Sequence, residues 1–108
     1  MSLLERKCVP CEGSVMPLLR TEANALMREV PGWSLAEDAK SIAREYQFRD
    51  FAEALAFVNA IGAVAEREGH HPDIEFGWGR VRVVLSTHAI GGLSPNDFIV
   101  AAKIDASS

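Results

Sequence analysis

The chain has 108 residues, of which 48% are hydrophobic and 24% are charged, and this size suits one globular domain rather than two. Its net charge of -4 provides no basic face for a phosphate backbone, so we expect no direct binding of nucleic acid. No apolar run approaches the roughly 18 to 20 residues that cross a bilayer, and no signal peptide is recognisable. The sequence therefore predicts a soluble, cytoplasmic protein with no membrane contact.

Residues 1–16 show no sustained hydrophobic periodicity, and we expect them to form a flexible leader to a single domain over 1–108. Cys8 and Cys11 form a CVPC motif within this leader. A zinc site needs two further ligands, and thioredoxin-like chemistry needs a βαβ unit, but neither accompanies the motif. Reduced, non-catalytic thiols are the favoured interpretation, with a redox role or a metal between subunits as the alternative.

A first helix is predicted after the leader, with Thr21 as its N-cap and Pro31-Gly32 as its end. Its apolar residues recur at helical spacing: Ala23, Leu26, Met27 and Val30. A short strand around Trp33 and Leu35, a polar turn, and a second strand over 42–48 then predict a hairpin.

The longest helix is predicted to begin at Asp50, with Glu53 completing a capping box, and to stop at Gly69. The stripe expected to face the core consists of Phe51, Ala54, Leu55, Val58, Ile61 and Ala65. Two acids, Glu66 and Glu68, fall in the last turn, where the helix dipole disfavours negative charge. Such violations of a local rule concentrate at functional sites.

Alternating residues predict two more strands, over 73–78 and 81–86. The sequence SPND at 94–97 then supplies an N-cap serine, a proline at the first helical position and an acid at the third, which predicts a final helix. The expected fold is α+β, an antiparallel four-stranded sheet with three helices packed on one face, in the order α-β-β-α-β-β-α. Because such a sheet keeps open edges, we expect a homo-oligomer.

The stretch EREGHHPD at 66–73 contains two of the three histidines, His70 and His71. If the second hairpin turns through Gly79-Arg80, Trp78 faces Val81 and His71 lies directly opposite His88. The three rings would then meet at one end of the hairpin, where they could serve as acid and base near neutral pH.

Simpler interpretations stay open for several of these residues. Asp97 is accounted for by its capping position, Trp78 by a place in the core or a pocket wall, and Glu66 by a solvated helix surface. A three-histidine zinc site is the competing chemical interpretation, but adjacent histidines seldom bind one metal together, so no metal is expected.

The spacing of Glu66, His70-His71-Pro72, Trp78, His88 and Asp97 resembles the signature of the pterin-4a-carbinolamine dehydratases, also called 4a-hydroxytetrahydrobiopterin dehydratases. The likeness extends to PGW at 31–33, FRDFAEALAFVN at 48–59, LSTH at 85–88, GGLS at 91–94 and the leader KCVPCEG at 7–13.

This resemblance implies a lyase that dehydrates a pterin hydroxylated at C4a to quinonoid dihydropterin, in a cycle that serves aromatic amino acid hydroxylases. It implies no metal or organic cofactor and a homodimer or homotetramer. His70 and His88 would be the acid-base pair, His71 would hold the pterin ring, and Glu66 would orient a histidine. The other residues implied to bind substrate or support the site are Pro72, Trp78, Ser86, Thr87 and Asp97.

Animal members of the same family also act as a dimerisation cofactor for a homeodomain transcription factor. A protein-binding role without essential catalysis is therefore the alternative function, and it would use an oligomerisation surface instead of the histidines. The presence of all three histidines favours catalysis.

Overall fold

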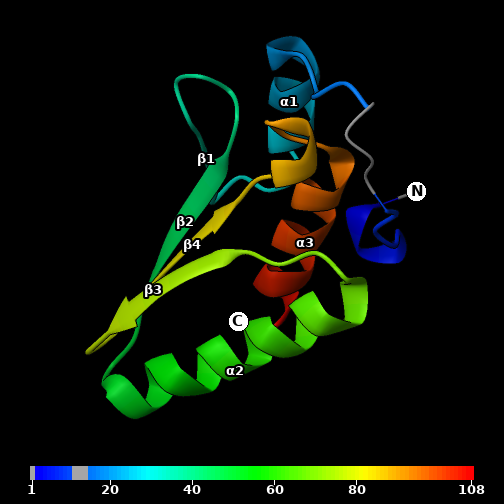
Figure 1. The fold of residues 1–108 in the computed structure, drawn as a ribbon. Helices are drawn as coiled ribbons and strands as arrows, with labels where there is room; N and C mark the ends of the chain where they lie inside the picture. The colour runs from blue at the N-terminus through cyan, green and yellow to red at the C-terminus, as the bar shows by residue number, and fades with distance from the viewer. Residues whose placement is uncertain (1, 11–14) are drawn as a thin grey trace.

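A four-stranded antiparallel sheet with three α-helices on one face makes up the fold, in the predicted order (Figure 1). The computed structural model describes residues 2–10 and 15–108. The elements are η1 (Leu3–Glu5), α1 (Arg20–Met27), β1 (Ser34–Leu35), β2 (Ile42–Gln47), α2 (Phe51–Glu68), β3 (Asp73–Gly77), β4 (Arg80–Leu85), η2 (His88–Ile90) and α3 (Pro95–Ala106). The α+β fold class is therefore confirmed.

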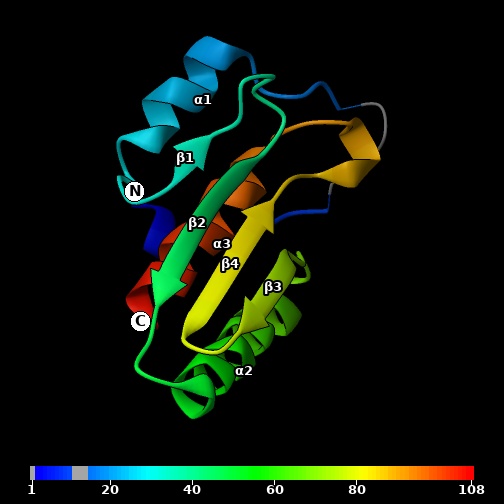
Figure 2. The same cartoon turned by 90° about the vertical axis from the view of Figure 1, so that its left-hand side faces the viewer.

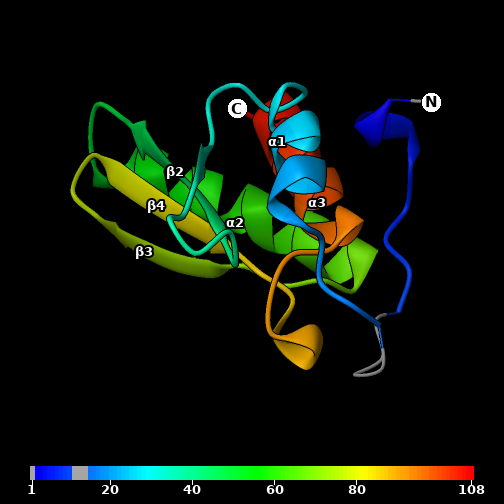
Figure 3. The same ribbon diagram turned by 90° about the horizontal axis from the view of Figure 1, so that it is seen from above.

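The sheet has the strand order β1-β2-β4-β3, so β4 is central and β3 is an edge strand. Alternate residues of β2 and β4 point toward the helices, and Ile42, Val81 and Leu85 among them are 0% exposed. Figures 2 and 3 show the helices gathered behind this one face. None of the described helices is long and apolar enough to cross a membrane.

The helix α3 is enclosed more completely than the others. Phe98, Val100, Ala101 and Ile104 are each 0% exposed, because the sheet lies on one side of the helix and the N-terminal segment on the other (Figure 1). Leu3 of η1 is 3% exposed and belongs to the same core. The part of the expected leader that the structure describes thus packs against the domain.

The caps of α2 agree with the prediction: the Asp50 side chain accepts the Glu53 N–H, and Gly69 ends the helix with φ 67°. The predicted stripe is partly wrong, because Phe51 and Leu55 are 44% and 41% exposed. The Phe51 ring packs 5.5 Å from that of Phe76, on the edge strand, where no further strand covers it.

The predicted cap of α1 is also wrong. The helix begins at Arg20, with Leu19 as N-cap, and the Glu22 carboxylate accepts the Leu19 N–H at 2.8 Å. Thr21 therefore lies inside the first turn, and the Glu22 side chain caps the helix by accepting the N–H of the N-cap residue Leu19.

The register of the second hairpin differs from the prediction. The pair Gly77 and Arg80 closes the ladder, so the turn consists of Trp78-Gly79 instead of Gly79-Arg80. Gly79 adopts φ 67°, and the carbonyl oxygen of Phe48 lies 2.8 Å from where a Cβ would stand, so only glycine fits there. Phe76 consequently pairs with Val81, two residues from its predicted partner, and the even shift preserves the faces.

Candidate functional site

A cavity of about 500 Å³ lies where the C-terminal end of α2, the segment after β4, the start of α3 and the N-terminal segment meet. Its walls include His70, His71, His88, Ser86, Thr87 and Cys8. All three histidines therefore border one cavity, although they come from two separate segments.

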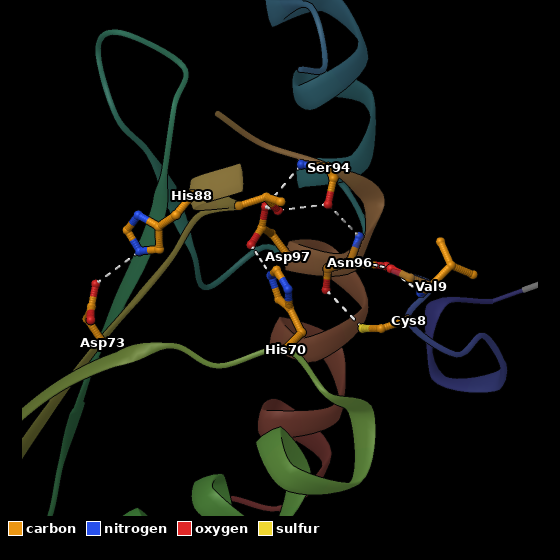
Figure 4. Close-up of polar contacts among 9 residues, drawn as sticks. Cys8, Val9, His70, Asp73, His88, Ser94, Asn96 and Asp97 are labelled. Atoms are coloured by element: carbon orange, nitrogen blue, oxygen red, sulfur yellow. Dashed lines mark hydrogen bonds and ion pairs between the residues drawn. The ribbon is translucent and has the colours of Figure 1, made fainter. Parts of the chain in front are cut away.

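The histidine His70 is the most enclosed of the three. Its Nε2 lies 2.6 Å from Oδ1 of Asp97, and the two side chains are 12% and 0% exposed. The other oxygen of Asp97 accepts the Thr87 hydroxyl at 2.8 Å and the Ser94 N–H at 3.0 Å (Figure 4). Asp97 thus receives three hydrogen bonds in a site closed to water.

The contact with Asp97 indicates which ring nitrogen of His70 carries a proton. An aspartate is ordinarily a carboxylate near neutral pH and a carboxylate only accepts hydrogen bonds, so we assign the donor role in this contact to His70 Nε2. A neutral ring then has its lone pair on Nδ1, where it can accept a proton. The pair Asp97–His70 is therefore arranged as an orienting acid and a base.

Local sequence signals account for both partners of this pair. Ser94 caps α3, and the Asp97 carboxylate returns a bond to the Ser94 N–H, so the capping box and the contact with His70 use the same carboxylate. Gly69 ends α2 in the left-handed conformation, which turns the chain and brings His70 toward α3. The capping bond and the contact with His70 thus coexist at Asp97.

The histidine His71 lies at the exposed rim. Its Nε2 is 2.6 Å from Oε2 of Glu66, and the side chains are 59% and 79% exposed. Glu66 is therefore positioned to orient a histidine, but in contact with solvent, which weakens the pair relative to the buried one.

The histidine His88 stands in η2 with its side chain 81% exposed, and its Nε2 lies 3.9 Å from Oδ2 of Asp73. In Figure 4 its ring is turned toward Asp73, away from His70. The predicted pairing of His71 with His88 across the strands is wrong, because β3 begins at Asp73 and β4 ends at Leu85.

Four expected site residues do not border the cavity: Glu66 and Asp97, which contact His71 and His70 from outside it, and Trp78 and Pro72. Trp78 occupies the hairpin turn and is 76% exposed. Both predicted positions for Trp78, in the core and in the wall of a pocket, are therefore wrong. Its place follows from the shifted turn. Pro72 is half-buried in the link between His71 and β3. Ser86 and Thr87 do border the cavity, and Thr87 is 4% exposed.

The sequence did not single out Asn96 as a wall residue, nor Glu68 as an acid buried beside the cavity. The Glu68 side chain is 4% exposed and pairs with Lys103 at 2.7 Å. Burial opposes its ionisation, but the bonds from Lys103 and from the Cys8 N–H outweigh it and lower the pKa of Glu68. The unfavourable position of Glu68 in the last turn of α2 was the sequence signal that could have identified it as a residue near the site.

The thiol of Cys8 borders the cavity but is not a nucleophile. Burial, with the nearby Glu68 carboxylate, raises the pKa of Cys8 to about 12, so the thiol stays protonated. Cys11 lies outside the described residues. Within 2–10 and 15–108, no group of three or more His, Cys, Asp or Glu side chains could hold a metal ion.

A family model and a related sequence both match this chain over most of its length. A sequence model of the family described as "Pterin 4 alpha carbinolamine dehydratase" matches residues 16–107. A protein of Halorhodospira halophila named "Putative pterin-4-alpha-carbinolamine dehydratase" is 52% identical over 106 residues, 98% of this chain and 97% of its own.

Two solved structures share the fold. A "transcriptional coactivator/pterin dehydratase" from Brucella melitensis aligns with a TM-score of 0.78 and 32% identity, over 83% of this chain and 96% of that one. A "pterin dehydratase-like protein" described as a RuBisCO assembly factor in the alpha-carboxysome aligns with a TM-score of 0.60 and 28% identity, over 69% and 87%.

Proposed function

The chain belongs to the pterin 4 alpha carbinolamine dehydratase family, and we propose that it removes water from a pterin that carries a hydroxyl group at C4a. The observation that carries this proposal is the buried Asp97–His70 pair beside a cavity that His88 also borders. The reaction needs a base at N5 and an acid at the departing oxygen, and the cavity offers a candidate for each.

The proposed mechanism divides the two proton transfers between the two segments. Nδ1 of His70 accepts the N5 proton, and the electrons of that N–H bond form the C4a=N5 double bond. In this proposal His88 acts in its protonated form and gives its proton to the hydroxyl oxygen as the C4a–O bond breaks and water leaves. Both rings return to their starting states by exchange with solvent, which reaches His88 directly.

His71 has a supporting role in this proposal. Held by Glu66 at the rim, it contacts the pterin ring without transferring a proton. The product is quinonoid dihydropterin, which must be reduced before reuse, so an aromatic amino acid hydroxylase is the proposed pathway partner.

A stopped assay on freshly generated 4a-hydroxytetrahydropterin tests the proposal. The variants His70→Ala and His88→Ala should each lose on the order of 10²- to 10⁴-fold in rate, the usual contribution of general acid-base catalysis. Lys40→Ala, an exposed position in the β1–β2 turn, is the control. Unchanged rates in both histidine variants would refute the assignment.

We also propose a homodimer or homotetramer. The edge strand β3 leaves one side of its backbone outside the ladder, and beside it Phe51, Leu55 and Phe76 are each more than a third exposed. A second copy would extend the sheet and cover this apolar patch. Light scattering of the intact chain tests the proposal, and a monomer at working concentrations would contradict it.

Protein binding without essential catalysis is the second candidate function, and the same exposed patch is what favours it. The two functions separate experimentally: a protein-binding role would survive His70→Ala, because His70 lies on a different part of the molecule from the patch.

A further inference from the structure

A second wall of the cavity comes from the N-terminal segment. Cys8, Val9 and Pro10 all border the cavity that the histidines line, and we call residues 8–10 the strap. The sequence model of the family matches from residue 16 onward, so the matched region does not include the strap.

The side chain of Asn96 holds the centre of the strap by two hydrogen bonds in opposite directions. The Val9 N–H donates to Asn96 Oδ1 at 3.0 Å, and Asn96 Nδ2 donates to the Val9 carbonyl at 2.6 Å (Figure 4). Neighbouring antiparallel strands exchange the same pair of bonds. Asn96 is 4% exposed and Val9 is 64% exposed, so the two bonds are partly buried, and together they fix the place and the orientation of the Val9 backbone.

A second attachment lies one residue earlier. The Cys8 N–H donates to Glu68 Oε1 at 3.1 Å, while the other oxygen of Glu68 pairs with Lys103. The Cys8 thiol lies 3.6 Å from the Asn96 carbonyl and points toward it (Figure 4). Because this thiol is protonated, the strap presents an uncharged surface to the cavity.

The chain is also fixed on both sides of the strap. Upstream, Leu3 is buried in the core beside α3. Downstream, the Leu18 N–H donates to the Leu93 carbonyl at 2.8 Å. The chain is therefore anchored by packing at Leu3 and by a backbone bond at Leu18, and the strap itself is held by Asn96 and Glu68.

Asn96 and Asp97 are consecutive residues in the first turn of α3. One holds the strap and the other holds His70, so a single helical turn determines the separation of two facing walls of the cavity. The distance between the strap and the proposed base is set by the helix and does not depend on a mobile loop.

We infer that the strap is part of the substrate-binding surface and that Asn96 is a positioning residue that holds it against the uncharged pterin ring. This inference rests on the proposed function. Asn96 acts on binding and not on proton transfer, because its side chain contacts the strap and neither His70 nor Asp97. Loss of the clamp should therefore raise KM and leave kcat nearly unchanged.

The test uses the full chain with Asn96→Ala, the isosteric Asn96→Asp, and Asn59→Ala as the matched control on the exposed surface of α2. Asn96→Asp keeps the volume and the acceptor for the Val9 N–H but loses the donor to the Val9 carbonyl, so it remains informative if Asn96→Ala folds poorly. The three readouts are amide exchange at Cys8 and Val9 by NMR, the Kd for 7,8-dihydrobiopterin by calorimetry, and the KM and kcat of the dehydration assay.

We expect faster exchange at Val9 in Asn96→Ala and a smaller increase in Asn96→Asp, which keeps the acceptor, with Kd and KM raised by about tenfold in Asn96→Ala, less in Asn96→Asp, and unchanged in the control. Unchanged amide exchange at Val9 in Asn96→Ala would refute the proposal that Asn96 holds the strap. Faster exchange with unchanged Kd and KM would overturn the role in binding, and so would a wild-type chain that does not bind the pterin. A wild-type chain that binds the pterin but does not dehydrate the substrate refutes the proposed function alone, since Kd still tests the strap.

Discussion

The two ends of α3 each carry an aspartate that gathers three donors, yet the two clusters differ in what lies beyond them. Asp97, at the N-terminal end, accepts from Ser94, Thr87 and His70. The dipole of the helix favours negative charge at this end. Two of its three partners, His70 and Thr87, border the cavity, so the position of the helix fixes the position of the His70 ring there.

Asp105, at the C-terminal end, accepts from Trp33, Arg44 and Tyr46, all of which come from the β1–β2 region. The dipole disfavours an acid there, and the Arg44 guanidinium at 3.1 Å compensates. None of these three donors borders the histidine cavity. The same residue type on one helix thus orients a catalytic candidate at one end and fastens helix to sheet at the other.

The change Asp97→Asn should remove the functional role of the N-terminal aspartate of α3. The amide can still accept from Thr87 and Ser94, but it then presents an NH₂ group to the Nε2–H of His70, which forces the ring into the other tautomer. We expect kcat to fall on the order of 10²- to 10⁴-fold, the range typical of a lost general base or a wrong tautomer. Steady-state dehydration kinetics measure the fall.

The matched control is Asp50→Asn at the N-cap of α2, because asparagine caps a helix as well as aspartate and Asp50 is remote from the cavity. Activity there should stay unchanged. A kcat within about threefold of wild type for Asp97→Asn would mean that the His70 tautomer is irrelevant to the reaction.

The change Asp105→Ala should lower the stability of the fold, because it removes the acceptor at the C-terminal end of α3. It leaves a buried indole N–H and the Tyr46 hydroxyl without their acceptor, at a cost of about 2 kcal/mol in the free energy of unfolding. For a chain of this size, that corresponds to roughly 10 °C in Tm. Thermal unfolding at fixed protein concentration measures it, and kcat at low temperature should stay within about twofold of wild type. If Asp105→Ala kept its Tm but lost its activity, Asp105 would have a functional role and the structural role assigned to it would be wrong.

The parts of the molecule that the sequence predicted correctly are those with local signals. Asp50 and Gly69 delimit α2 through contacts within a single turn, and Ser94 with Pro95 begins α3 in the same way. Strand alternation identified Val81 and Leu85 as core residues. These signals depend on neighbours in the chain, so periodicity and capping residues are sufficient to detect them.

The parts that could not be predicted depend on contacts between distant residues. The hairpin register is fixed by Gly79 beneath the Phe48 carbonyl, which no local pattern reveals. The strap joins Val9 to Asn96 across 87 positions, and Tyr46 reaches Asp105 across 59. The spacing of the histidines indicated that they belong together, but not that His88 would turn toward Asp73 in an exposed 3₁₀ turn.

Alkaline titration sharpens the comparison, because Tyr46 is the single tyrosine of the chain and reports only on the Asp105 end. Burial, with the hydrogen bond to Asp105, raises the pKa of Tyr46 above its ordinary value of 10, although Arg44 opposes the rise. Above pH 10 the unfolded chain loses this proton before the folded one, so stability present below pH 10 should decline by about 1.4 kcal/mol per pH unit as pH rises toward the folded pKa. Urea unfolding between pH 9 and pH 11, in wild type and Tyr46→Phe, isolates this contribution as the difference between the two. Equal slopes, or phenolate absorbance that appears near pH 10 in the still-folded protein, would show that the Asp105 cluster is as open to solvent as the rim of the histidine cavity.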